Sequence, residues 1–166
     1  IIFIIFIIFI IFIISLKMSS FVPVSTHIVE SSVINIPIEV IWSSISSLDF
    51  LWWQLIQSSS LKHGNSNNSI GSVITLNFKD GVTWDIQIQE ISNLRHFVTF
   101  EVISSEPAST VTSAIHTISL KKITSTNGTF IEWITDFSND ANAEVISDSR
   151  FKRLEAFTNL SNLFTA

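Results

Sequence analysis

The stretch that decides the fold is GSVITLNFKDGVTWDIQIQEISNLRHFVTFEV, which spans residues 71–102. It contains three runs in which apolar and polar residues alternate, a period typical of strands with one covered and one solvent-facing side. Asp80-Gly81 provides a tight turn after the first run, and 92–95 provides the second turn. The stretch therefore predicts three consecutive strands. Their covered side is expected to hold Ile74, Leu76, Phe78, Trp84, Ile86, Ile88, Val98, Phe100 and Val102.

The flanking sequence predicts the remaining elements. Pro37 followed by Glu39 in PIEVIW is typical of a helix start, and the last helix is expected to be amphipathic. The predicted strands are 26–36, the three runs of 71–102, 110–123 and 129–137. The predicted helices begin at 37, at 51 (to 56) and at 147 (to 164), and the Ser- and Asn-rich segment 58–69 is expected to be a loop. The predicted apolar stripe of the last helix is Phe151, Leu154, Phe157, Leu160 and Leu163 or Phe164.

Several short motifs occur in an order that resembles a known family. They are IPIEVIW at 36–42, LDF at 48–50 with a Trp at 52 or 53, GSV at 71–73, RH at 95–96, and IEW at 131–133 with Phe137. Together they resemble the START-like (SRPBCC) superfamily, most closely its polyketide cyclase/dehydrase branch, which includes the plant abscisic-acid receptors. The resemblance implies an α+β helix-grip fold: a curved antiparallel sheet wrapped around a long C-terminal helix, with two short helices after strand 1 and a ligand cavity between sheet and helix.

The domain organisation follows from composition. The length of 166 residues suits one domain, which we place at 26–166, preceded by a flexible segment at 18–25. Residues 1–14 contain only Ile and Phe, and the only Met is Met18. Our hypothesis is that the low-complexity segment 1–17 comes from an AT-rich repeat upstream of the true start codon and does not belong to the natural protein.

Composition also narrows the classes of function. The net charge of −5 and the scarcity of basic clusters argue against nucleic acid as a partner. The absence of Cys excludes thiolate catalysis and Cys-based zinc sites, and the four histidines show no metal-ligand spacing. We expect no cofactor, no metal, no stable membrane insertion of the domain and a cytoplasmic location, whereas the oligomeric state stays open.

The resemblance also bears on catalysis. Positions that carry polar cavity groups in relatives correspond here to Ile74, Ile86, Gln57 and Ala114. An active site built on the first two of these positions would lack its electrostatic stabiliser and its proton-transfer group. The resemblance therefore favours binding over catalysis.

Two ionisable residues remain as candidates near the covered face. The alternation of 110–123 places His116 inward. Its role there has three alternatives: a core histidine whose hydrogen bonds are made by a neighbouring hydroxyl or water, a ligand contact, or a general acid/base. Glu132 matches a cavity glutamate of the hormone receptors, but the parity of Ile131 and Trp133 places it in solvent. Parity is the stronger of these two arguments.

These observations predict an internal site for a hydrophobic small molecule of lipid, sterol-like or polyketide-like character. The alternatives are a cyclase or dehydratase that uses His116 and Glu132, and a co-chaperone-like interaction module that needs no cavity. Trp84 and Phe100 are either ligand wall or plain core. The predicted ligand contacts are Gln57, Ile74, Leu76, Trp84, Ile86, Phe100, Ala114, His116 and Phe157.

Overall fold

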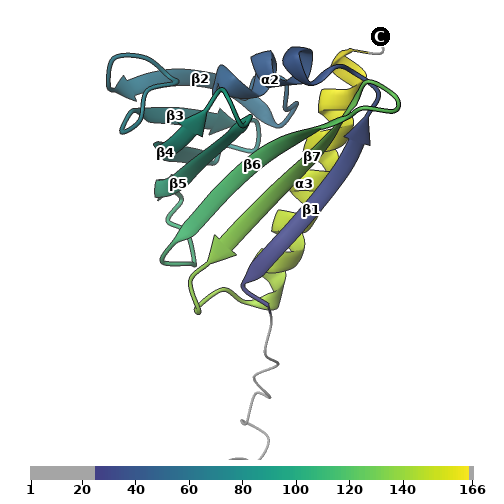
Figure 1. The fold of residues 1–166 in the computed structure, drawn as a ribbon. Helices are drawn as coiled ribbons and strands as arrows, with labels where there is room; N and C mark the ends of the chain where they lie inside the picture. Colours follow the sequence, from purple (N-terminus) through teal and green to yellow (C-terminus); the bar gives the residue numbers. More distant parts are fainter. Residues whose placement is uncertain (1–24, 165–166) are drawn as a thin grey trace, which may run out of the picture.

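A computed structural model describes residues 25–164 of the chain. Seven antiparallel strands form one sheet in the order β1-β7-β6-β5-β4-β3-β2, and a long C-terminal helix, α3, lies against one face of this sheet (Figure 1). The elements are β1 (His27–Ile34), α2 (Ile38–Ser46), β2 (Ile56–His63), β3 (Val73–Phe78), β4 (Thr83–Ser92), β5 (Phe97–Glu106), β6 (Ala114–Ile123), β7 (Gly128–Phe137) and α3 (Ala143–Leu163). The predicted α+β helix-grip architecture is confirmed.

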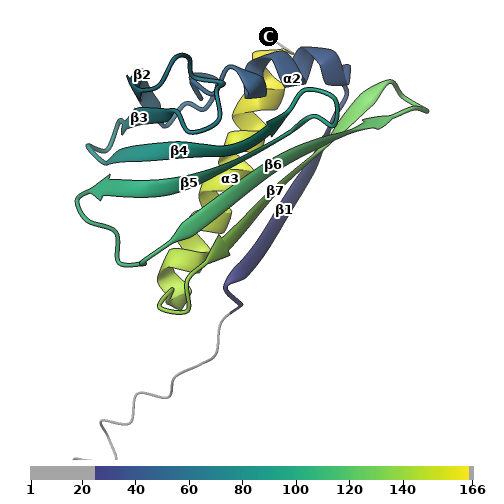
Figure 2. The same ribbon diagram turned by 60° about the vertical axis from the view of Figure 1, so that its left-hand side comes forward.

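The sheet curves around α3, and α2 closes one end of the space between them. Figure 2 shows α2 beside the C-terminal end of α3, whereas the N-terminal end of α3 lies near the connections that join β5 to β6 and β7 to α3. Different elements therefore lie at the two ends of α3. The predicted segment 1–17 and nearly all of 18–25 lie outside the described residues.

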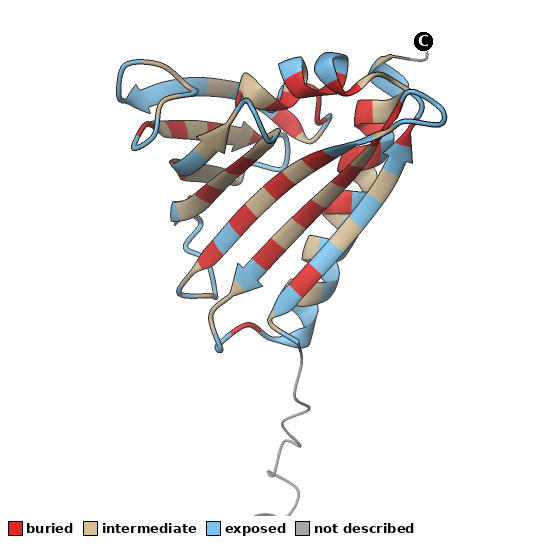
Figure 3. Ribbon diagram, in the orientation of Figure 1, coloured by how far each residue is buried: buried red, intermediate tan, exposed pale blue. Residues whose placement is uncertain are grey.

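The three strands predicted in 71–102 are present as the meander β3, β4 and β5, and the residues predicted to share the covered side do so. Leu76 pairs with Trp84 and Ile88 pairs with Phe100 across neighbouring strands. Burial alternates along these strands and along β6 and β7, as the bands in Figure 3 show. A slip of one residue would expose every covered side chain, so burial on one face fixes the register. Trp84 and Val102 are only partly buried, because they lie where the core gives way to a pocket.

The segment between α2 and β3 differs from the prediction. Residues 51–55 form turns instead of a second short helix, and positive φ angles at Leu48 (55°) and Phe50 (53°) break the helical path just before them. The segment 56–63, most of which was expected to be loop, forms the edge strand β2 and pairs with β3. Its side chains are mostly exposed, so it lacks the alternating pattern that would predict a strand.

The C-terminal helix begins earlier and faces the sheet differently than predicted. It starts at Ala143, where the side-chain oxygen of Asn142 accepts a hydrogen bond from the Val145 N–H at 2.9 Å. Phe157 and Leu160 of the predicted stripe are buried, but Phe151 is 70% exposed and Leu154 is 48% exposed. The face that meets the sheet is instead formed by Arg153, Ala156, Phe157, Asn159 and Leu160.

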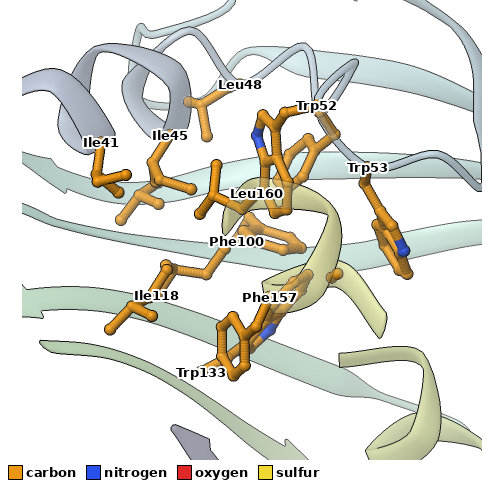
Figure 4. Packing of buried hydrophobic residues seen from close by; sticks show 14 of the residues in the cluster. Ile41, Ile45, Leu48, Trp52, Trp53, Phe100, Ile118, Trp133, Phe157 and Leu160 are labelled. Atoms are coloured by element: carbon orange, nitrogen blue, oxygen red, sulfur yellow. The ribbon is translucent and has the colours of Figure 1, made fainter. Parts of the chain in front are cut away.

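The hydrophobic core occupies one half of the space between sheet and helix. Ile45, Leu48 and Trp52 lie around Leu160 in Figure 4, with Ile41 beyond Ile45, and all five belong to one buried cluster. Trp133, Phe100 and Ile118 contribute from the sheet and Phe157 from α3 in the same view. Asn159 holds this end of the helix, since its side-chain oxygen accepts the Gln54 N–H at 2.8 Å. The other half contains a pocket, which lies beside the N-terminal part of α3.

Candidate functional site

The candidate site is a pocket of about 520 Å³ between the sheet and the N-terminal half of α3. Residues of β4, β6, β7 and the first part of β5 form its floor. The segment 103–113, which contains the end of β5 and the β5–β6 connection, forms one wall through all of its residues except Glu106, and α3 forms the opposite wall. Its apolar lining includes Trp84, Val102, Ala114, Trp133 and Val145. The volume falls within the range of small-molecule sites.

Three of the predicted ligand contacts line this pocket, namely Trp84, Ala114 and His116. Five others are almost completely buried side chains of the packed core and do not line it: Ile74, Leu76, Ile86, Phe100 and Phe157. The prediction placed the cavity too close to the centre of the sheet, because inward parity does not distinguish a packed side chain from a cavity wall.

The remaining polar candidates also lie outside the pocket. Gln57 is exposed on the edge strand β2, so we do not retain it as a ligand contact. Glu132 lies between the buried residues Ile131 and Trp133 on β7 and does not line the pocket, in agreement with strand parity. His116 and Glu132 therefore do not share a cavity.

His116 is fixed in the floor of the pocket. Its ring is stacked with Phe100, at 5.0 Å between centroids, and with Trp84, at 6.2 Å. Its Nδ1 lies 2.8 Å from Thr135 Oγ1, 3.2 Å from Arg153 Nη2 and 3.4 Å from Trp133 Nε1. Arginine and tryptophan N–H groups can only donate, so Nδ1 must accept. The proton of the neutral ring is therefore on Nε2.

The protonation state of His116 agrees with this geometry. Burial, and after it the positive charge of Arg153, lower the pKa of His116 well below its ordinary value of 6.5. The ring is consequently neutral at physiological pH. A neutral imidazole with its proton on Nε2 and its Nδ1 engaged offers a ligand one hydrogen-bond donor, and no free nitrogen that accepts a proton.

Arg153 is the functional candidate that the sequence reasoning missed. It projects from α3 into the same cluster, is only 3% exposed, and its guanidinium carbon lies 5.4 Å from the centroid of the Trp133 ring. It donates hydrogen bonds to the hydroxyls of Thr135 and Ser149. Burial lowers the pKa of Arg153 to about 10, so the side chain is still charged at neutral pH.

Within residues 25–164, no group of three or more His, Asp or Glu side chains is arranged to hold a metal ion. Over the same range, no helix combines the length and the hydropathy that a membrane span requires.

No protein-family model and no curated protein matches the sequence. Solved structures do match it. A protein from Nitrosospira multiformis superposes with a TM-score of 0.75 and 22% identity, covering 84% of this chain and 97% of its own. The chain therefore has the helix-grip fold.

Two plant proteins also superpose on the chain over most of their length. Ara h 8.0201 matches with a TM-score of 0.70 and 18% identity, covering 82% of this chain and 95% of its own. Major latex-like protein 151 from Panax ginseng matches with a TM-score of 0.66 and 16% identity, with the same two coverages. Likeness at this identity defines the fold, so the polyketide cyclase/dehydrase branch stays a prediction.

Proposed function

We propose that this START-like chain binds a hydrophobic small molecule of lipid, sterol-like or polyketide-like character in the pocket between the sheet and α3. The observation that carries the proposal is a pocket of about 520 Å³ whose lining includes Trp84, Val102, Ala114 and Trp133. Covering roughly 300 Å² of apolar ligand surface is worth on the order of 7 kcal/mol before ordering costs. Burial of this size supports specific binding without a covalent step.

Part of the 103–113 wall is an exposed segment that can open and admit a ligand to the pocket. Residues 107–113 lie outside the strands and are mostly exposed, and Thr112 is tied to the β7–α3 connection by hydrogen bonds from its N–H and its hydroxyl to Asp140, at 2.9 and 2.6 Å. A segment with exposed backbone can open at lower cost than a paired strand. We expect a ligand to enter past this segment.

The geometry favours binding over the cyclase or dehydratase alternative. That alternative needs His116 and Glu132 in one cavity, but Glu132 is not in the pocket. His116 Nδ1 is already engaged, and its Nε2 carries the proton. The interaction-module alternative needs no cavity, and blocking the cavity distinguishes it from the present proposal.

Ala114→Phe is expected to abolish uptake of a neutral apolar fluorescent probe, N-phenyl-1-naphthylamine. Ala114 is 7% exposed and lines the pocket, so a phenyl group there occupies the ligand volume. The unfolding free energy should change by less than about 1.5 kcal/mol, because the added side chain fills existing space. Probe fluorescence and urea denaturation measure the two effects.

Ile115→Phe is the matched control, since Ile115 is the next residue on β6, is 39% exposed and does not line the pocket. It should leave probe uptake unchanged. If Ala114→Phe lowered the unfolding free energy by several kcal/mol and left probe uptake unchanged, the site would be packed core. That result would favour the interaction module.

A further inference from the structure

Arg153 carries a buried positive charge that no carboxylate neutralises by direct contact in the described part of the chain. The two acidic residues that act electrostatically on Arg153 have ion-pair partners of their own. Asp148 is 2.8 Å from Lys152 Nζ, and Glu30 is 2.6 Å from Arg150 Nε. The hydrogen bonds that Arg153 does make go to neutral acceptors on Thr135, His116 and Ser149. Buried charges in folded proteins are usually paired.

Three side chains beside the pocket each carry a buried nitrogen with no hydrogen-bond partner: Trp53 Nε1, His116 Nε2 and Arg153 Nε. All three side chains line the pocket. They surround Trp133, with the Trp53 ring at 5.7 Å, the His116 ring at 6.1 Å and the guanidinium carbon at 5.4 Å from the Trp133 ring. Buried donors without partners are uncommon in native proteins.

All three atoms are donors. Trp53 Nε1 and Arg153 Nε carry a hydrogen in every state, and His116 carries its proton on Nε2 because Nδ1 accepts. The group that would satisfy them must offer several acceptor lone pairs. It must also carry negative charge, because Arg153 is charged at neutral pH.

We propose, on the basis of the proposed function above, that the ligand is an amphiphile with a carboxylate at one end, and that Arg153, His116 and Trp53 bind this carboxylate while the apolar body extends toward the 103–113 wall. A singly charged head group fits because Lys152 is already paired with Asp148, and because Glu30 and Asp148 act on Arg153 without contacting it, so its guanidinium is the one cation of the pocket lining with no carboxylate in direct contact. The apolar lining by Trp84, Val102 and Ala114 suits the body of such a molecule.

The test compares decanoate with 1-decanol, two ligands with the same chain length and different head groups. Binding is measured at neutral pH by displacement of N-phenyl-1-naphthylamine and by calorimetry. We expect the wild-type protein to bind decanoate at least about tenfold more tightly than decanol. Arg153→Met should lose this preference and retain decanol binding within about threefold, since Met preserves the apolar length of the side chain.

Arg153→Lys and the control Lys122→Met complete the set of variants. Arg153→Lys keeps the charge without the planar fork, so a reduced preference for decanoate should remain. Lys122→Met removes one charge at an exposed residue of β6 that does not line the pocket, and it is expected to leave the preference unchanged.

The outcomes separate this inference from the proposed function. Equal affinity of the wild-type protein for decanoate and decanol would overturn the carboxylate assignment while leaving the binding function intact. Failure of both ligands and of the probe to bind would overturn the binding function itself. A preference for decanoate that persists in Arg153→Met would also overturn the assignment. The wild-type comparison decides even if a variant does not fold.

Discussion

Trp133→Ala is expected to lower the unfolding free energy by about 3–5 kcal/mol, the usual cost of deleting a large buried aromatic side chain. Trp133 is 2% exposed and packs edge-on against Trp53, Phe100 and Phe157 at centroid distances of 5.7 to 6.5 Å. It also lies beneath the guanidinium of Arg153. Deleting it removes the packing that joins core and pocket. Urea denaturation of both proteins measures the loss.

Trp133→Phe is the control for this substitution. It keeps a ring in the cluster and should cost clearly less than Trp133→Ala, because less volume is removed. If Trp133→Ala changed the unfolding free energy by less than about 1 kcal/mol, the surrounding side chains would have to collapse into the vacated space. Such a collapse is incompatible with a defined cavity beside Trp133.

Leu160→Ala and Leu154→Ala are expected to differ strongly, although both residues belong to the apolar stripe predicted from sequence. Leu160 is fully buried, so its truncation should cost about 2–5 kcal/mol. Leu154 is 48% exposed, so its truncation should cost less than about 1 kcal/mol. Urea denaturation measures both unfolding free energies. If the two substitutions lowered them equally, α3 would have to be rotated about its axis so that Leu154 is as buried as Leu160.

The buried side could be predicted from the sequence for the strands of 71–102 but only in part for α3. In the 71–102 stretch, each strand has one unbroken parity, and the opposite parity would bury Asp85 and Gln87, so only one register is possible. In α3, Phe151 and Leu154 are exposed, and Phe157 and Leu160 share the buried face with Arg153, Ala156 and Asn159. A stripe drawn from hydrophobicity alone leaves those three residues out, because a buried Arg and a buried Asn are uncommon.

The missed elements lack the signals on which sequence reasoning depends. β2 (Ile56–His63) is an edge strand with a mostly exposed surface, so neither of its faces is selected for apolar residues. The turns at 51–55 follow two residues with positive φ, Leu48 and Phe50, and nothing in these residue types requires that conformation.

The location of the pocket could be predicted only in part. Trp84, Ala114 and His116 were identified because strand parity points them inward. The wall formed by 103–113 was missed because 110–113 had been assigned to a strand, whereas β6 begins at Ala114. Arg153 was missed because its environment comes from β6 and β7, through contacts with residues 18 and 37 positions away along the chain.

Nuclear magnetic resonance of the indole N–H groups tests the central claim most directly, that the space between the sheet and α3 binds a small molecule. The chain contains five tryptophans. Trp53, Trp84 and Trp133 line the pocket, whereas Trp52 does not, and Trp42 donates to Asn93 at 3.0 Å outside it. On titration with N-phenyl-1-naphthylamine, the three pocket signals should shift together and saturate at one dissociation constant, while the other two stay in place. Unchanged pocket signals at saturating probe, or shifts confined to Trp42 and Trp52, would contradict the account.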